Sequence, residues 1–124
     1  MSEGVATAVN DTCNQWTIDE IASTLYRERK MPTIAMMRRR FRTGGYEGMI
    51  NYLTAASLVR FIDKRYGRSR LRELWQSGGM GGVQRVLGVS VLTLEKAWRN
   101  EIGARRGVSS WSVMSRTIEA EGCE

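Results

Sequence analysis

Residues 52 to 98 constrain the fold of this chain most, because they contain several short apolar segments separated by glycines. The first segment places its apolar residues three and four positions apart, which is the spacing of a helix with one apolar stripe. These residues are Tyr52, Ala55, Ala56, Val59, Ile62 and Tyr66. An apolar stripe of this kind has to be covered, so we expect the helix to pack against neighbouring helices.

Glycines divide the rest of this stretch. Gly67 is placed to end the first helix in a left-handed conformation, and glycines 78, 79, 81 and 82 end a second apolar face. Gly88 stops a third short helix, after which Ser90 can cap a last helix that turns Leu94, Ala97 and Trp98 inward. We therefore predict one shared core, to which the following residues contribute: Tyr52, Phe61, Tyr66, Trp75, Leu87 and Trp98.

The order of these segments resembles the helical C-terminal subdomain of the peptidase MA-like family, which contains gluzincin-type zinc metallopeptidases. The resemblance rests on "YLTAASLVRFIDKRYG", a glycine-rich joint and "VLGVSVLTLEKAWR", and it extends weakly over residues 7 to 51. In that family, a helix with HExxH supplies two zinc ligands and a general base, and a second helix supplies a glutamate as third ligand. The opening "MSEGVATAV" looks like that second helix with everything upstream missing, so the resemblance implies that Glu3 is the third zinc ligand.

The resemblance implies metal-assisted peptide hydrolysis for a complete enzyme, with zinc as cofactor and a peptide as substrate. This chain has no histidine and no HExxH, so we expect no zinc site and no activity from the chain alone. Val5, Ala8 and Val9 then form an apolar face built for an absent neighbour, which an upstream catalytic segment or self-association would cover. From the residues alone, Glu3 is better explained as an acidic residue at a helix start.

Length and composition fit one small all-α domain. The chain has 124 residues and 14.0 kDa, 42% of its residues are hydrophobic and it contains one proline. We predict about five to six helices in residues 1 to 103. No apolar run approaches the roughly 20 residues that span a membrane, and no signal peptide is evident. The sequence therefore does not indicate a cellular compartment.

The two cysteines, Cys13 and Cys123, are almost the whole chain apart. They can pair only if the C-terminal tail folds back, and we expect two reduced thiols. Residues 104 to 124 are rich in serine and charge with weak periodicity, so we predict a mostly mobile, disordered tail, although Trp111, Val113 and Met114 could dock a short segment.

The clearest local helix signal lies in residues 16 to 29. Thr17 and Glu20 have the spacing of a capping box, and Trp16 and Ile21 have that of a hydrophobic staple. Pro32 predicts the end of this helix, and another helix starts at Thr33 and runs towards Phe41.

The net charge of +6 and the pI near 9.9 suggest weak, non-specific nucleic-acid binding. The densest charge run, Arg38, Arg39, Arg40 and Arg42, contains one aromatic residue, whereas a base-stacking surface needs several, so we favour a solvated helix rim.

Residues 83 to 98 support an alternative function, because they resemble a DNA-binding helix-turn-helix. Its second helix would present Val91, Leu92, Glu95 and Lys96, a poor set for reading base edges, and we favour the metallopeptidase-like interpretation. Other chemistries lack their residues: there is no phosphate-binding GK[ST] and no histidine for a catalytic triad. Four scattered carboxylates, Glu47, Asp63, Glu73 and Glu95, form no distinctive pair.

Overall fold

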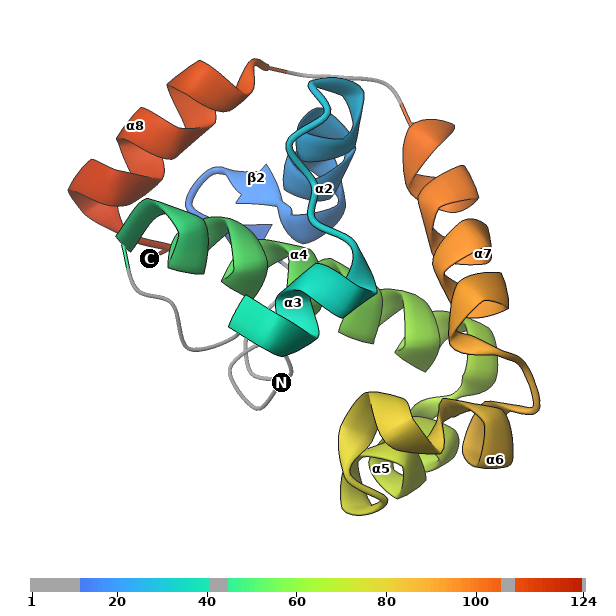
Figure 1. Cartoon of the computed structure of the whole chain (residues 1–124). Coiled ribbons are helices and arrows are strands. Elements are labelled where there is room, and N and C mark those ends of the chain that lie inside the picture. Colours follow the sequence, from blue (N-terminus) through green and yellow to red (C-terminus); the bar gives the residue numbers. More distant parts are fainter. Residues whose placement is uncertain (1–11, 41–44, 106–108, 124) are drawn as a thin grey trace.

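The protein is described here by a computed structural model that covers residues 12–40, 45–105 and 109–123. This part of the chain contains seven α-helices, one 3-10 helix and one two-stranded hairpin, so the all-α prediction is confirmed (Figure 1). Six of the α-helices, α2 to α7, lie before residue 104, in agreement with the predicted five to six, and the seventh, α8, lies in the C-terminal tail. In chain order the elements are β1 (Thr12–Cys13), β2 (Trp16–Thr17), α2 (Ile18–Arg27), α3 (Ile34–Arg40), α4 (Gly45–Tyr66), α5 (Arg68–Gln76), η1 (Gly79–Gly82), α6 (Val83–Leu87), α7 (Val91–Gly103) and α8 (Trp111–Glu121).

Helix α4 is the axis of the fold. It is 22 residues long, and α2, α3 and α5 all pack against it, while α7 and α8 pack against α2. Ten of its residues are buried, and they occupy more than one face, because neighbours cover it from several sides. The segments α5, η1 and α6 gather at one end of the molecule, and α8 lies at the opposite end (Figure 1).

Helix α2 begins as its sequence predicts. The Thr17 hydroxyl accepts a hydrogen bond from the Glu20 amide at 3.0 Å, and the Glu20 carboxylate accepts one from the Thr17 amide at 2.7 Å. This capping box satisfies two backbone donors that a helix start would otherwise leave open. Trp16, which we expected at the helix start, instead pairs with Cys13 in the antiparallel hairpin that precedes it.

The short helices after α4 also follow their sequence signals. Gly88 ends α6 with φ 77°, a left-handed conformation, and the Ser90 hydroxyl caps α7 by accepting from the Thr93 amide at 3.1 Å. Leu94 and Trp98 lie in α7, and both side chains are fully buried. The indole of Trp98 donates to the Ser57 hydroxyl of α4 at 3.1 Å, which satisfies the one polar atom of this large side chain.

Two predictions in this region are wrong in detail. Gly67 has a positive φ of 95°, but its ψ of 157° is extended rather than left-handed helical. Trp75, predicted as a core residue, is 41% exposed, because Leu71 and Leu74 already fill the buried side of the short helix α5.

The C-terminal tail is the main correction to the sequence analysis. Residues 111 to 121 form α8, which packs against α2, whereas we expected a mostly mobile segment. Trp111, Met114 and Ile118 lie three and four positions apart and are all buried, so the tail does carry an apolar stripe. The Trp111 amide donates to the Glu28 carboxylate at 2.8 Å, which ties the start of α8 to the end of α2.

Cys13 and Cys123 form a disulfide, so the expectation of two reduced thiols is also wrong. Their Cα atoms are 4.1 Å apart. The Asn14 amide donates to the Cys123 carbonyl oxygen at 2.8 Å, and the Asn14 side chain donates to the Gly122 carbonyl oxygen at 3.1 Å. The folded chain therefore brings together two segments whose proximity nothing in the local sequence indicates.

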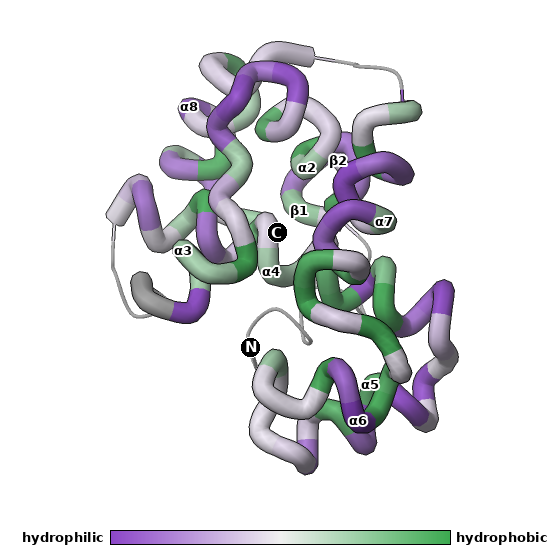
Figure 2. The backbone as a smooth tube through the Cα atoms, turned by 45° about the vertical axis from the view of Figure 1, so that its right-hand side comes forward, coloured by the Kyte–Doolittle hydropathy of each residue, from purple (hydrophilic) through white to green (hydrophobic). Residues whose placement is uncertain are grey.

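None of the helices within the described ranges has the length and apolar character needed to cross a membrane. Each helix combines hydrophobic and hydrophilic stretches, as the hydropathy colouring in Figure 2 shows.

Candidate functional site

The residue that the sequence analysis connects to chemistry, Glu3, lies outside the residues that the structure describes. The same holds for Val5, Ala8 and Val9, the apolar face expected beside it. The metal-ligand prediction therefore stays a prediction.

The residues present in this chain do not fit a complete zinc site. Within residues 12–40, 45–105 and 109–123, no three acidic, cysteine or histidine residues gather in a way that could hold a metal ion. The sequence contains no histidine, and both cysteines are used in the disulfide. A catalytic zinc needs three protein ligands, so Glu3 can supply at most one of them.

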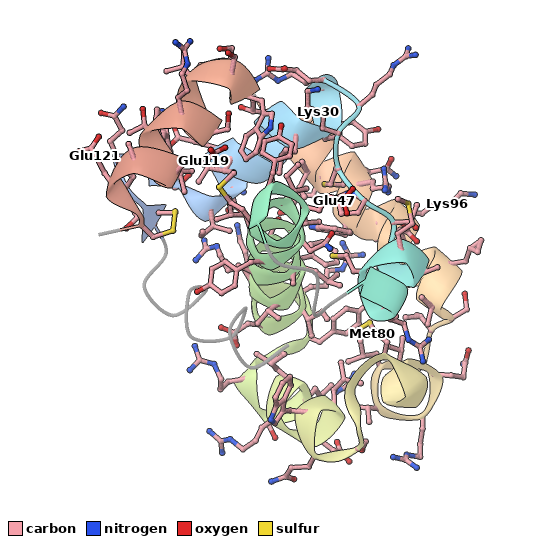
Figure 3. The ribbon with its side chains drawn as sticks, turned by 60° about the vertical axis from the view of Figure 1, so that its left-hand side comes forward. Lys30, Glu47, Met80, Lys96, Glu119 and Glu121 are labelled. Carbon is pink, nitrogen blue, oxygen red and sulfur yellow. A yellow bond between two sulfur atoms is a disulfide. The ribbon has the colours of Figure 1, made fainter. Side chains whose placement is uncertain are left out.

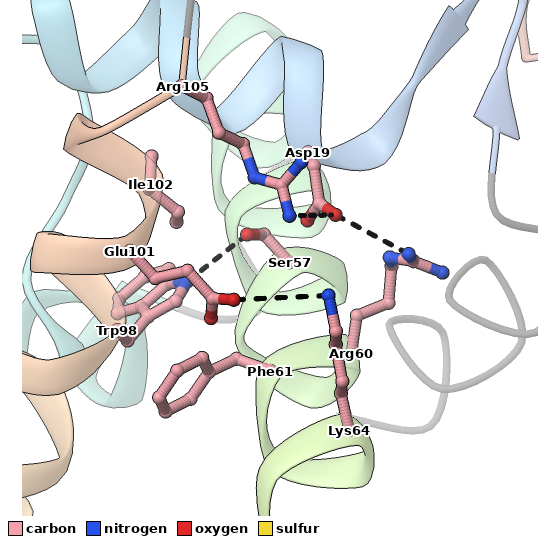
Figure 4. A pocket seen from close by; sticks show the side chains of 9 residues that line it. All are labelled: Asp19, Ser57, Arg60, Phe61, Lys64, Trp98, Glu101, Ile102 and Arg105. Carbon is pink, nitrogen blue, oxygen red and sulfur yellow. Dashed lines mark hydrogen bonds and ion pairs between the residues drawn. The ribbon is translucent and has the colours of Figure 1, made fainter.

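The most concentrated charges in the described structure join α2, α4 and the end of α7 (Figure 4). The Asp19 carboxylate lies 3.4 Å from the Arg60 guanidinium and 3.3 Å from that of Arg105. Beside them, the Lys64 ammonium lies 4.0 Å from the Glu101 carboxylate. No local sequence pattern indicates this cluster, because its members come from α2, α4, α7 and the turn just after α7, and only the packing of these segments brings them together.

The electrostatics of this cluster resemble those of an active site. Burial raises the pKa of Asp19 above its usual value, and Arg105 partly opposes that rise. Burial also lowers the pKa of Arg60, and repulsion from Arg105 adds to the effect. Half-buried groups with a shifted pKa are candidates for catalysis.

The cavity beside the cluster leaves little room for a bound substrate. The cavity that Asp19, Ser57 and Lys64 line has a volume of about 10 Å³, which is room for one water molecule at most. The cluster therefore acts as an ion-pair network that fixes α2, α4 and α7 relative to one another.

The carboxylates singled out in the sequence have separate local roles. Asp63 accepts two hydrogen bonds of 2.8 Å from Arg68, and these bonds lower the pKa of Asp63. Glu95 accepts from the Arg99 guanidinium at 3.2 Å and from the Ile34 amide at 3.3 Å. The second bond lets a residue of α7 cap the start of α3.

Two larger hollows border α3. The first, which we call the α3–α4 cleft, has a volume of about 430 Å³ and lies between the connection from α2 to α3 and the start of α4. Residues 29–32 and Met36 form one wall, and Tyr46, Glu47, Ile50 and Asn51 form the other. Its size falls in the range of small-ligand and side-chain sites, which is about 300–1,000 Å³.

The second hollow is smaller and almost wholly apolar. It has a volume of about 210 Å³ and lies between α3, α4 and the glycine-rich joint, where Met37, Leu58 and Met80 line it. Among the described residues that line it, Arg38 is the one with a charge. The side chains of Arg39 and Arg40 and the whole of Arg42 lie outside the described part of the structure.

The helix-turn-helix candidate has the expected chain path in α6, Gly88 and α7. Helix α6 is only five residues long, and the second helix presents Leu92, which is 71% exposed, at its N-terminal end. Glu95 is held by α3 in the same half of the helix. An exposed leucine and a carboxylate are a poor surface for phosphates and base edges.

Comparisons with known proteins give no family for this chain: no family model, no curated protein and no solved structure matches it.

Proposed function

We propose that this chain is the helical C-terminal portion of a zinc metallopeptidase of the peptidase MA-like type. In this proposal Glu3 is one zinc ligand, and the two histidines and the general base come from an HExxH helix that this sequence does not contain. The chain alone then neither retains zinc nor hydrolyses peptides, since a single carboxylate is a weak zinc ligand.

The observation that supports the proposal best is the order of helices between residues 52 and 98. A long helix, a short helix after Gly67, a glycine-rich joint, another short helix and a capped final helix follow one another, as the resemblance implies. Trp98 closes this arrangement by packing against the long helix and donating to Ser57. This support concerns packing, whereas the chemistry depends on Glu3.

The experiment that tests the proposal compares the 124-residue chain with a protein expressed from the longer reading frame. We expect the upstream nucleotides, read in frame with the Met1 codon, to encode an HExxH motif. The longer protein should contain zinc and show peptidase activity that EDTA removes, and the short chain should show neither. Stoichiometric zinc together with EDTA-sensitive proteolysis in the short chain would refute the proposal, as would an upstream frame without HExxH.

Nucleic-acid binding is the second candidate, and the left-handed Gly88 between α6 and α7 is the observation that favours it. The exposed leucine and the engaged carboxylate of α7 argue against sequence-specific recognition. We therefore limit this candidate to weak contacts between the basic surface and phosphates, which need no recognition helix.

A further inference from the structure

The α3–α4 cleft has the features of a binding site that belongs to neither proposed function. We propose that it binds an extended peptide segment in which an acidic residue lies next to a large apolar residue. The inference does not rest on the metallopeptidase proposal, because the described lining of the cleft comes from residues 29–32, 36, 46, 47, 50 and 51 and its test contains no metal.

Charge on one wall of the cleft selects for an acidic ligand. Arg29 and Lys30 are exposed on this wall, and neither forms an ion pair or a side-chain hydrogen bond within the described residues. The connection from α2 to α3 is among the most hydrophilic parts of the chain in Figure 2. Two cations on one wall attract a carboxylate, and a ligand that brings one supplies the missing partner.

The backbone of Arg29 gives an independent reason to regard it as functional. Its φ is 59°, in the left-handed region that glycine favours. It follows the last residues of α2 in a Schellman motif: its amide donates to the Tyr26 carbonyl oxygen at 3.1 Å, and the Lys30 amide donates to the Leu25 carbonyl oxygen at 2.8 Å. An arginine at a position usually taken by glycine is less stable than glycine would be, so its side chain is a candidate for a role outside folding.

Below this charged wall the cleft is apolar. Met31 is buried, Met36 is half-buried, and Ile50 completes the apolar surface from the opposite wall. Methionine side chains are flexible and adapt to ligands of different shape. This part of the cleft suits a leucine- or methionine-sized side chain more than a rigid ring.

The opposite wall favours a peptide over an anionic polymer. Glu47 lies there, across the cleft from Lys30, and it forms no ion pair within the described residues (Figure 3). A carboxylate at this position repels polyphosphate but accepts hydrogen bonds from peptide N–H groups.

Both walls are held in place before any ligand binds. The Arg99 guanidinium of α7 donates to the Pro32 carbonyl oxygen at 3.3 Å and fixes the loop wall. On the opposite wall, the indole of Trp111 donates to the Tyr46 hydroxyl. Fixed walls reduce the entropy lost on binding.

The test uses the whole 124-residue chain without metal and a short fluorescein-labelled peptide with a central Leu-Glu pair. A second peptide with Leu-Lys in its place is the ligand control. We expect fluorescence anisotropy to show saturable binding of the first peptide only, and amide chemical-shift changes to concentrate in residues 29 to 51. Absence of saturable binding, or shift changes elsewhere, would overturn the proposal.

Two exposed lysines provide matched variants, Lys30→Glu at the cleft and Lys96→Glu on α7 (Figure 3). Each changes the net charge from +6 to +4, because one positive charge becomes negative. We expect Lys30→Glu to weaken peptide binding about fivefold to tenfold and Lys96→Glu by less than about twofold. Equal weakening by both would mean non-specific attraction to the basic surface and would refute the site.

The variant Arg29→Gly distinguishes an effect on peptide binding from an effect on the stability of the fold. It should weaken peptide binding severalfold and at the same time raise the melting temperature by about 1–3 °C, since glycine suits the left-handed conformation. Unchanged affinity in this variant would contradict the proposal. Amide shift changes in residues 29 to 51 on addition of decanoate, together with no binding of the Leu-Glu peptide, would replace the peptide with a fatty acid as the ligand.

Discussion

Loss of the disulfide between Cys13 and Cys123 should lower the stability of this domain more than most single changes. The two residues are separated by 110 positions, so the bond closes a loop of almost the whole chain. In the chain-entropy description, closing a loop of that length removes unfolded-state entropy worth about 4.8 kcal/mol at about 25 °C. Structure that persists in the unfolded state reduces this figure, and we expect a loss of about 3–5 kcal/mol.

A loss of this size is a large share of the roughly 5–15 kcal/mol that stabilises a typical domain. Helix α8 should respond first, because the bond connects its C-terminal end to the hairpin before α2. The Asn14 hydrogen bonds to Gly122 and Cys123 depend on the same contact. Amide exchange in residues 111 to 123 should therefore accelerate more than exchange in α4.

The assay is urea unfolding of the oxidised chain, the reduced chain and the double variant Cys13→Ala/Cys123→Ala. The oxidised chain should have the highest midpoint and the smallest dependence on urea, because its cross-linked unfolded state exposes less surface. The double variant serves as control, since reductant should not change its unfolding. Two free thiols in the air-oxidised protein, or equal stability with and without reductant, would refute this reasoning.

Three further predictions concern the core, the surface charges and nucleic acid. Trp98→Ala should cost about 3–5 kcal/mol, because the side chain is fully buried and Ser57 loses its donor, whereas Trp75→Ala at a 41% exposed position should cost less than about 1 kcal/mol in the same thermal melts. The lowered pKa of Asp63 means that its bonds from Arg68 stabilise the fold above the usual pKa of 3.8 and lose this effect as the pH falls through the folded-state pKa. The stability difference between the wild type and Asp63→Asn should therefore shrink in acid, and a difference that is independent of pH would contradict this. DNA binding, measured by anisotropy on unrelated duplexes, should be weak and should fall steeply with salt, and a footprint on one sequence at physiological salt would instead favour the helix-turn-helix interpretation.

The parts of the fold that could be predicted from the sequence depend on neighbouring residues. The capping box of Thr17 and Glu20, the left-handed Gly88 and the Ser90 cap each involve residues within four positions, and all three are present in the structure. Burial of Trp98 followed from its place one turn after Leu94.

The parts that could not be predicted depend on distant segments. Helix α8 has an apolar stripe of only Trp111, Met114 and Ile118, and its order comes from contacts with α2 and the hairpin, which lie between 83 and 110 positions away in the chain. The same limit applies to the Asp19 cluster and to the α3–α4 cleft, whose walls come from different elements. The left-handed conformation of Arg29 could not be predicted either, because its position after a helix is visible in the sequence but its positive φ is visible only in the structure.

The role of Glu3 is tested most directly by the zinc affinity of the protein with the upstream HExxH segment restored. Glu3→Gln should weaken zinc binding by at least about tenfold, because a neutral amide replaces a charged ligand. The matched control is Glu119→Gln, which removes the same charge from an exposed position on α8 and should leave the affinity unchanged (Figure 3). One zinc per chain whose affinity falls in Glu3→Gln alone is the result we predict, and equal zinc affinity in both variants would contradict the proposed function.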